Sequence, residues 1–164
     1  RDPRSVPDAV TIDNGYQLRG AVDLVEESKD GSALRVTDHK TGKDRHRDSL
    51  RIGGGEVLQP VLYSAVVQRV LGKPVTESRL YFCTSAGGYK ERPVRLTDEA
   101  RRAGIEALEI IDRAIEHGTL AAAPREGACT WCDFRVVCGP NEERRTGRKP
   151  REFIADLIEL RSRP

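Results

Sequence analysis

Two carboxylates and one lysine stand at a spacing that suits metal-assisted hydrolysis. Asp23 closes the segment Gly20-Ala21-Val22-Asp23, and Asp38 and Lys40 lie in Val36-Thr37-Asp38-His39-Lys40-Thr41-Gly42. Hard divalent ions such as Mg²⁺ and Mn²⁺ bind oxygen ligands and retain several waters. These residue types therefore indicate a site that could bind such an ion next to a fixed positive charge.

The candidate metal ligands are the carboxylates of Asp23 and Asp38 and the backbone carbonyl of His39. This incomplete shell leaves room for a phosphate oxygen. Lys40 lies two residues beyond Asp38, so both side chains point to the same face of a strand. Its ammonium would orient or help deprotonate the attacking water and offset the charge on the phosphorane. The pattern predicts hydrolysis of a phosphodiester.

Three elements must position these side chains. Residues 16–26 and 34–40 are rich in β-branched and apolar residues and predict two strands, with a turn at Lys29-Asp30-Gly31-Ser32 between them. A helix follows at Gln59-Pro60-Val61-Leu62-Tyr63, where Gln59 and Tyr63 share one face at i and i+4. Proline in the first helical turn lacks only an amide that this turn leaves unpaired.

This order resembles the PD-(D/E)xK nuclease superfamily, most closely its RecB-like and AddB-like branch. In that branch a Gly-x-x-Asp strand is followed by an Asp-x-Lys-Thr-Gly strand and by a helix with Gln and, four residues on, Tyr. The resemblance implies an α/β fold, with a small mixed central sheet flanked by helices as in restriction endonucleases and a cysteine-rich C-terminal lobe. It also implies five site residues, in which Gln59 steadies the lysine or the phosphate and Tyr63 lines the path of the strand: Asp23, Asp38, Lys40, Gln59 and Tyr63.

The resemblance further implies a Mg²⁺- or Mn²⁺-dependent deoxyribonuclease. Its substrate would be a DNA end or a single strand during recombination or repair, with exonuclease action favoured over sequence-specific cutting. A helicase module in the same or another chain is the implied partner. The alternative is a catalytically silent domain that binds DNA or a helicase, with the cysteine segment as a structural clip. The presence of Asp23, Asp38 and Lys40 together favours the nuclease.

A second group of residues consists of Cys129, Cys132 and Cys138. Thiolates at this spacing suit a soft metal or an iron–sulfur cluster. The spacing is also similar to the last three ligands of the [4Fe-4S] site in AddB-like enzymes and CRISPR-associated RecB-like nucleases, whose fourth cysteine precedes the first catalytic strand. No cysteine precedes Cys83 here, and the Cys83 segment favours a buried strand instead. A zinc site and three reduced thiols remain as alternatives.

The chain contains no methionine and opens close to its first predicted strand, so we expect it to be the C-terminal portion of a longer protein. Residues 1–124 would form the nuclease core without its N-terminal helical part. Residues 125–164 would form the cysteine-rich lobe and a C-terminal helix.

Composition agrees with one modest α/β domain, because 164 residues with 37% apolar content can bury a single core. No segment is apolar enough to span a bilayer, and cytoplasm is the expected location. The net charge of +2 does not by itself indicate nucleic acid. Local basic stretches at residues 43–51 and 144–151 are candidates for contact with phosphates.

The remaining pattern predicts a second hairpin, with strands over residues 75–84 and 89–96 and a turn at residues 85–88. Thr97 is expected to cap a helix that ends at Gly118, with an apolar stripe of Ile105, Leu108, Ile111 or Asp112, and Ile115. A last helix, begun by Pro150, is expected to bury Phe153, Ile154, Leu157 and Ile158.

Overall fold

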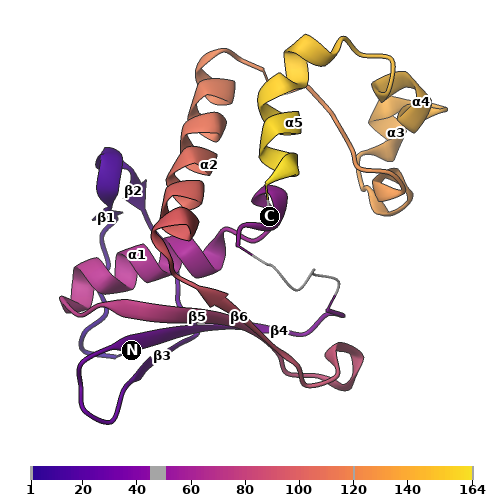
Figure 1. Cartoon of the computed structure of the whole chain (residues 1–164). Coiled ribbons are helices and arrows are strands. Elements are labelled where there is room, and N and C mark those ends of the chain that lie inside the picture. Colours follow the sequence, from indigo (N-terminus) through magenta and orange to yellow (C-terminus); the bar gives the residue numbers. More distant parts are fainter. Residues whose placement is uncertain (1, 45–50, 120, 164) are drawn as a thin grey trace.

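A mixed sheet forms the centre of the protein in the computed structural model, which describes residues 2–44, 51–119 and 121–163 (Figure 1). Among these residues the central sheet has four strands in the order β3-β4-β5-β6. The strands are β3 (Leu24–Glu27), β4 (Leu34–Lys40), β5 (Val75–Phe82) and β6 (Glu91–Arg95). β4 and β5 are parallel, and each outer strand is antiparallel to its neighbour. The predicted α/β class with a small mixed sheet is confirmed.

The predicted strand over residues 16–26 is divided into two pieces. Its first part is β2 (Gln17–Leu18), which pairs with β1 (Val10–Thr11) in a separate two-stranded sheet. Its second part is β3, which pairs with β4 across the expected turn, where Gly31 has a φ of +71°. Between them the chain passes the ring of Tyr63, where a Cβ atom on Gly20 would lie 3.5 Å from Tyr63 Cε1.

Helix α1 (Gln59–Leu71) connects β4 to β5 and covers one face of the sheet (Figure 1). Parallel neighbours need such a crossover, and Pro60 is tolerated because it lies in the first turn. Val61 and Val67 of this helix share the hydrophobic core with Val36 of β4 and Leu80 of β5. The helix therefore packs directly behind the two central strands.

Helix α2 (Asp98–Glu116) lies beyond α1 and begins at the expected cap, where the Thr97 side chain accepts a hydrogen bond from the Ala100 amide. Its buried face differs from the predicted stripe and consists largely of small residues: Ala100, Gly104, Ala107 and Ile110. A Cβ atom on Gly104 would lie 2.7 Å from Val61 Cγ1, so α1 approaches too closely for large side chains. Ile115 of the predicted stripe is 60% exposed as a result.

The C-terminal region contains three further helices among the described residues. They are α3 (Arg135–Cys138), α4 (Glu142–Thr146) and α5 (Ala155–Ser162), and Figure 1 shows α3 and α4 set apart from the sheet. Leu160 of α5 packs on the turn at Gly53–Gly55, where a Cβ on Gly55 would lie 2.7 Å from Leu160 Cδ2. The predicted burial of Phe153 and Ile158 is wrong, because both are exposed.

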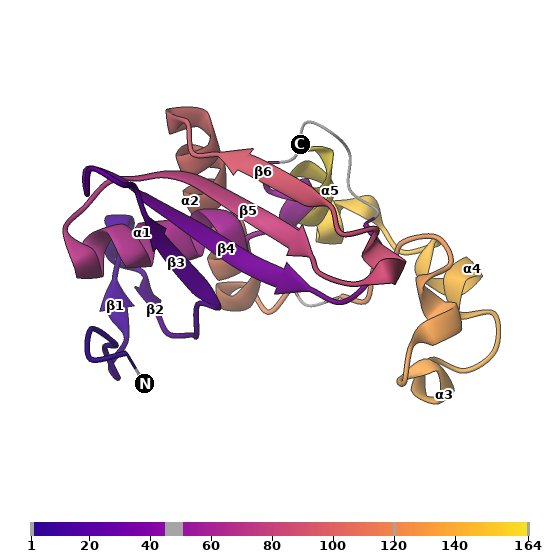
Figure 2. The same cartoon turned by 90° about the horizontal axis from the view of Figure 1, so that it is seen from below.

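The face of the sheet opposite α1 lies in front of the helices in Figure 2. It carries an ion-pair cluster formed by Glu26, Arg35, Thr37 and Arg79. Arg35 donates to both Glu26 carboxylate oxygens at 3.0 and 2.8 Å, and Arg79 Nη2 donates to the same carboxylate at 3.0 Å. This cluster joins three neighbouring strands by side-chain contacts.

No helix within the described residues is long and apolar enough to cross a bilayer.

Candidate active site

The site residues of β4 divide between the two faces of the sheet because side chains alternate along a strand. Asp38 and Lys40 share the face covered by α1 with the core residue Val36, whereas Thr37 and His39 point to the other face. Asp38 and Lys40 stand at the carboxyl end of the strand. The strand thus holds a carboxylate and an ammonium side by side below the start of α1.

A chain of contacts joins Asp38, Lys40, Gln59 and Tyr63. Lys40 Nζ lies 2.6 Å from Asp38 Oδ2 and donates to Gln59 Oε1 at 2.6 Å. Gln59 Nε2 in turn donates to the Tyr63 hydroxyl at 3.4 Å. A lysine can only donate, so the Gln59 oxygen must face it, and the amide NH₂ then faces the phenol. The ammonium is fixed from two sides.

Asp38 is the buried member of this chain, with 5% of its surface exposed. Its Oδ2 atom is buried and accepts no hydrogen bond of acceptable geometry from any described residue, although Lys40 Nζ is only 2.6 Å away. Lys40 therefore contributes charge at Oδ2 but is poorly directed as a donor. A buried carboxylate oxygen with an unfilled coordination position suits a cation.

Asp23 reaches the same end of β4 from the residue before β3. Its Oδ2 accepts a hydrogen bond from the His39 amide at 2.8 Å and lies 3.7 Å from His39 Nδ1. The N–H and C=O of one strand residue point to the same side. The His39 carbonyl therefore faces the strand edge at which the Asp23 carboxylate lies.

The three sequence segments also meet through Gly20. A Cβ atom at this position would lie 3.5 Å from Tyr63 Cε1, so the backbone of the first segment passes against the phenol ring. Gly20 precedes Asp23 by three residues, and Tyr63 follows Gln59 by one helical turn. Asp38 thus contacts Lys40 within β4, and each of the other predicted site residues contacts a residue of another segment or of its own helix.

Oxygen donors at the carboxyl end of β4 fit a hard divalent ion by their chemistry. The Asp23 carboxylate lies against the His39 backbone, and the Asp38 carboxylate lies on the face covered by α1, with Lys40 Nζ 2.6 Å from its Oδ2. No group of three His, Cys, Asp or Glu side chains that could bind a metal occurs in the described ranges. A metal here would thus be bound by two side chains, a backbone oxygen and water.

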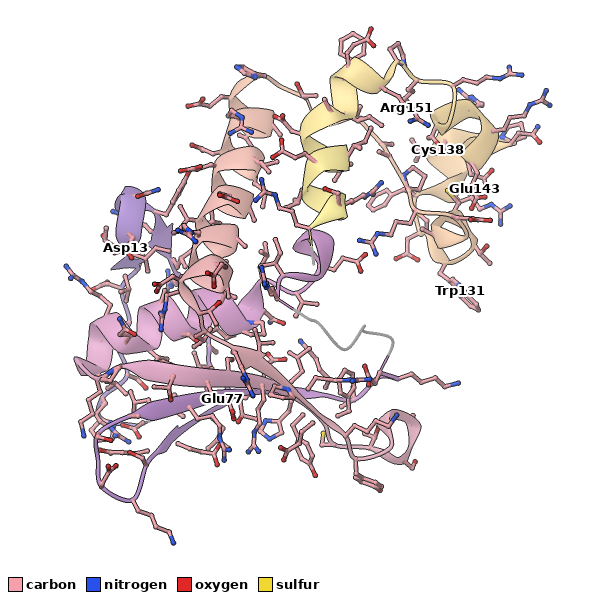
Figure 3. The ribbon with its side chains drawn as sticks, viewed as in Figure 1. Asp13, Glu77, Trp131, Cys138, Glu143 and Arg151 are labelled. Atoms are coloured by element: carbon pink, nitrogen blue, oxygen red, sulfur yellow. The ribbon has the colours of Figure 1, made fainter. Side chains whose placement is uncertain are left out.

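The cysteine segment lies in the separate lobe of α3 and α4. Figure 3 labels Trp131 and Cys138 there, and the Trp131 ring, 89% exposed, projects away from the lobe. Cys129 is buried and Cys132 exposed. Burial raises the pKa of the Cys129 thiol, and the charges of Glu143 and Glu142 and the other two thiols act in the same direction. The three cysteines do not form a gathered metal site within the described part of the chain.

Sequence reasoning missed the residues that fix the chain after Lys40. The Cys83 amide donates to the Lys40 carbonyl at 3.0 Å, and Thr84 Oγ1 donates to the Thr41 carbonyl at 3.0 Å. Cys83 was predicted as a core residue, but it is half-buried and lies at the end of β5 against this carbonyl. The parallel pairing of β4 with β5 creates these contacts, and no local pattern indicates it. The basic stretch at 43–51 lies largely outside the described residues, at positions 45–50.

A mixed sheet with a parallel central pair, flanked by helices and bearing an Asp-x-Lys at the end of one central strand, defines a restriction-endonuclease-like fold. Comparison with known protein families matches residues 1–139 to the PD-(D/E)XK nuclease superfamily. The chain belongs to this superfamily of phosphodiester-cleaving nucleases. A search of curated proteins found no match.

Proposed function

We propose that this protein is a metal-dependent deoxyribonuclease whose site is formed by Asp23, Asp38, Lys40, Gln59 and Tyr63. The observation that carries the proposal is the contact chain from Gln59 through Lys40 to the buried Asp38 carboxylate, which fixes an ammonium 2.6 Å from Asp38 Oδ2. Membership of a nuclease superfamily supports the reaction class.

Asp23, Asp38 and the His39 carbonyl would hold Mg²⁺ or Mn²⁺, which would supply charge stabilisation and a more acidic water. Lys40, fixed by Gln59 and Asp38, would donate a hydrogen bond to the attacking water and so orient it. The attacking water would lose a proton to solvent as its oxygen forms a bond to phosphorus and the ester bond to the leaving sugar oxygen breaks. That oxygen would take up a proton from solvent or from a site residue. The Lys40 charge would also offset the charge on the phosphoryl oxygens.

We also propose the finer assignments that the family resemblance implies. The substrate would be a DNA end or a single strand in recombination or repair, attacked as an exonuclease attacks it, and the enzyme would be of the RecB-like or AddB-like type. A helicase module would be its partner. The cysteine lobe would carry a metal or a [4Fe-4S] cluster on Cys129, Cys132 and Cys138. The three thiols are too few for a complete cluster site, and none of the steps above passes through this lobe.

The test is cleavage of single-stranded and duplex DNA by the native protein and by Asp38→Ala, with Mg²⁺, with Mn²⁺ and with EDTA. We expect the substitution to lower the rate by at least about a hundredfold, because it removes the central metal ligand. Asp112→Asn, on the exposed side of α2, is the matched control and should cut at the native rate. Equal cutting by native protein and Asp38→Ala would contradict the assignment.

A catalytically silent domain gives a different result in the same experiment. Native protein would bind DNA without cutting it under any of the metal conditions. Labelled 5′ or 3′ ends on the substrate would separate exonuclease action from internal cutting: single nucleotides released from one end support the proposal, and early internal fragments contradict it.

A further inference from the structure

The turn between β5 and β6 is attached to the chain that follows Lys40. Thr84 Oγ1 donates to the Thr41 carbonyl at 3.0 Å. Gly87 lies so close that a Cβ there would be 2.9 Å from the Gly42 carbonyl oxygen. Figure 2 shows this turn beside the carboxyl end of β4. Any group held by the turn is therefore held at a fixed place relative to the candidate active site.

A second contact strengthens this attachment. Arg92 Nε, at the start of β6, donates to Asp44 Oδ2 at 2.6 Å, and only 4% of the Asp44 side chain is exposed. A charge-assisted bond to a buried carboxylate is strong and well oriented. The loop after Lys40 and the β5–β6 turn thus form one body with two anchors.

Tyr89 at this turn has a backbone conformation that suits glycine. Its φ is +53°, next to Gly88 with a φ of +70°, and its amide donates to the Thr84 carbonyl at 3.2 Å. A bulky L-residue adopts the left-handed region at a cost in free energy, whereas glycine adopts it freely. The ring does not offset this cost by packing, because Tyr89 is 63% exposed. Strain that packing does not offset is typical of binding and catalytic positions.

Two exposed lysines belong to the turn and to the loop to which it is attached. Lys90 follows Tyr89 directly and runs along Gly88, where a Cβ would lie 3.5 Å from Lys90 Cε. Lys43, in the loop to which the turn is attached, is exposed as well. Exposed aromatic rings together with ammonium groups are the combination with which proteins bind unpaired bases and their phosphates.

We propose that the Tyr89 ring is a stacking platform for a base of single-stranded nucleic acid whose neighbouring phosphodiester enters the site at Asp38 and Lys40. This inference rests on the proposed function and names its substrate class. Stacking on a tyrosine accepts any base, but the bases inside a duplex offer no free face. The platform therefore selects single strands and frayed ends over paired DNA.

The test measures binding of a fluorescent oligothymidylate and of a blunt duplex to the protein in EDTA, where hydrolysis does not proceed. Tyr89→Gly should weaken single-strand binding by about 5- to 100-fold, since each stacked base contributes on that scale. Tyr89→Phe keeps the ring and should bind as native protein does. Phe153→Ala, which removes an exposed aromatic ring near α5, is the control and should also bind normally.

Two further readouts make the result decisive. Tyr89→Gly should unfold at the native urea concentration or a higher one, because it relieves the backbone, so its weaker binding would not reflect misfolding. Tyr89→Gly should bind the blunt duplex with the same affinity as native protein does. If Tyr89→Gly binds the single strand as tightly as native protein does, the proposal is overturned, and the exposed ring would instead contact a protein partner. If Tyr89→Gly loses duplex binding by the same factor as single-strand binding, the proposed preference for single strands is overturned. Failure of the proposed function appears separately, as equal cutting by native protein and Asp38→Ala.

Discussion

Lys40 lies at the end of a strand, and two side chains from two elements, Asp38 of β4 and Gln59 of α1, hold its ammonium. Asp38 places a carboxylate oxygen 2.6 Å from Nζ, and Gln59 supplies a directed acceptor at the same distance. Without such partners a half-exposed lysine would sample many rotamers in water. The contacts with Asp38 and Gln59 therefore keep the Lys40 ammonium in position.

Gln59 acts on the reaction through Lys40, so we treat it as a positioning residue. Gln59→Ala removes the acceptor and should lower kcat by about 10- to 100-fold while KM changes by less than about threefold, as expected for loss of a hydrogen bond to a charged group. Steady-state cleavage of labelled DNA measures both constants. Tyr63→Phe leaves the Lys40 contact intact and should cost less than about fivefold.

A rise in KM at constant kcat would show that Gln59 binds substrate rather than holding the lysine.

At the scale of elements, ion pairs on the open face of the sheet connect its strands. Glu26 of β3 accepts from Arg35 and Thr37 of β4 and from Arg79 of β5. The hydrogen bond from Arg35 is the largest cause that lowers the pKa of the Glu26 carboxyl, to about 2 from its ordinary value of 4.5; the Thr37 hydroxyl and the charges of Arg79 and Arg35 add to it. The ionised form is thus the form that supports the sheet.

This pKa predicts how stability depends on pH. A carboxyl whose pKa is lower in the folded state stabilises the fold fully above pH 4.5, and this contribution is lost as the pH falls towards 2. Glu26→Gln should therefore lower the free energy of unfolding at pH 7, by on the order of 1 kcal/mol once solvent screening is allowed for. The deficit should shrink between pH 4.5 and pH 2.

Urea unfolding at several pH values, followed by circular dichroism, measures this difference. Glu91→Gln is the matched control, since Glu91 contacts Arg79 from β6 but is 54% exposed on its side chain. A deficit for Glu26→Gln that stays constant down to pH 2 would mean that packing, and not charge, accounts for it.

At the scale of the whole molecule, the C-terminal lobe with helices α3 and α4 lies apart from the central sheet (Figure 1). The lobe has short helices, and four large apolar side chains remain exposed on it: Trp131, Phe134, Val136 and Val137. A small lobe with so little buried apolar surface is the kind of structure that a bound metal stabilises.

Metal analysis of protein purified without air tests this directly. We expect iron with broad visible absorption, or zinc without it, and loss of either in Cys132→Ser. Cys83→Ser should keep the metal, because Cys83 lies at the end of β5 against the Lys40 carbonyl. Protein free of both metals would contradict a metal role for the lobe and leave three reduced thiols. DNA cleavage is an independent readout, so the two proposals can fail separately.

The local sequence was sufficient to predict several features. The turn at Gly31, the helix start at Gln59 with its tolerated Pro60, and the Thr97 cap all lie where the residue types indicate. Such features depend on backbone dihedrals and on hydrogen bonds within one turn, which neighbouring residues determine. The i and i+4 relation of Gln59 to Tyr63 follows from the same local geometry.

Other features were decided only when distant segments met. The split of residues 16–26 depends on pairing with β1 and on the passage of Gly20 past Tyr63. The buried face of α2 follows Gly104 because α1 approaches there, which no periodicity within α2 reveals. The sequence by itself shows Asp23, Asp38, Lys40 and Gln59 in their order, since residue type and spacing are local properties. The position of Asp23 at the His39 amide, and of the Tyr89 turn beside β4, arises from contacts across the sheet, which only the packed molecule fixes.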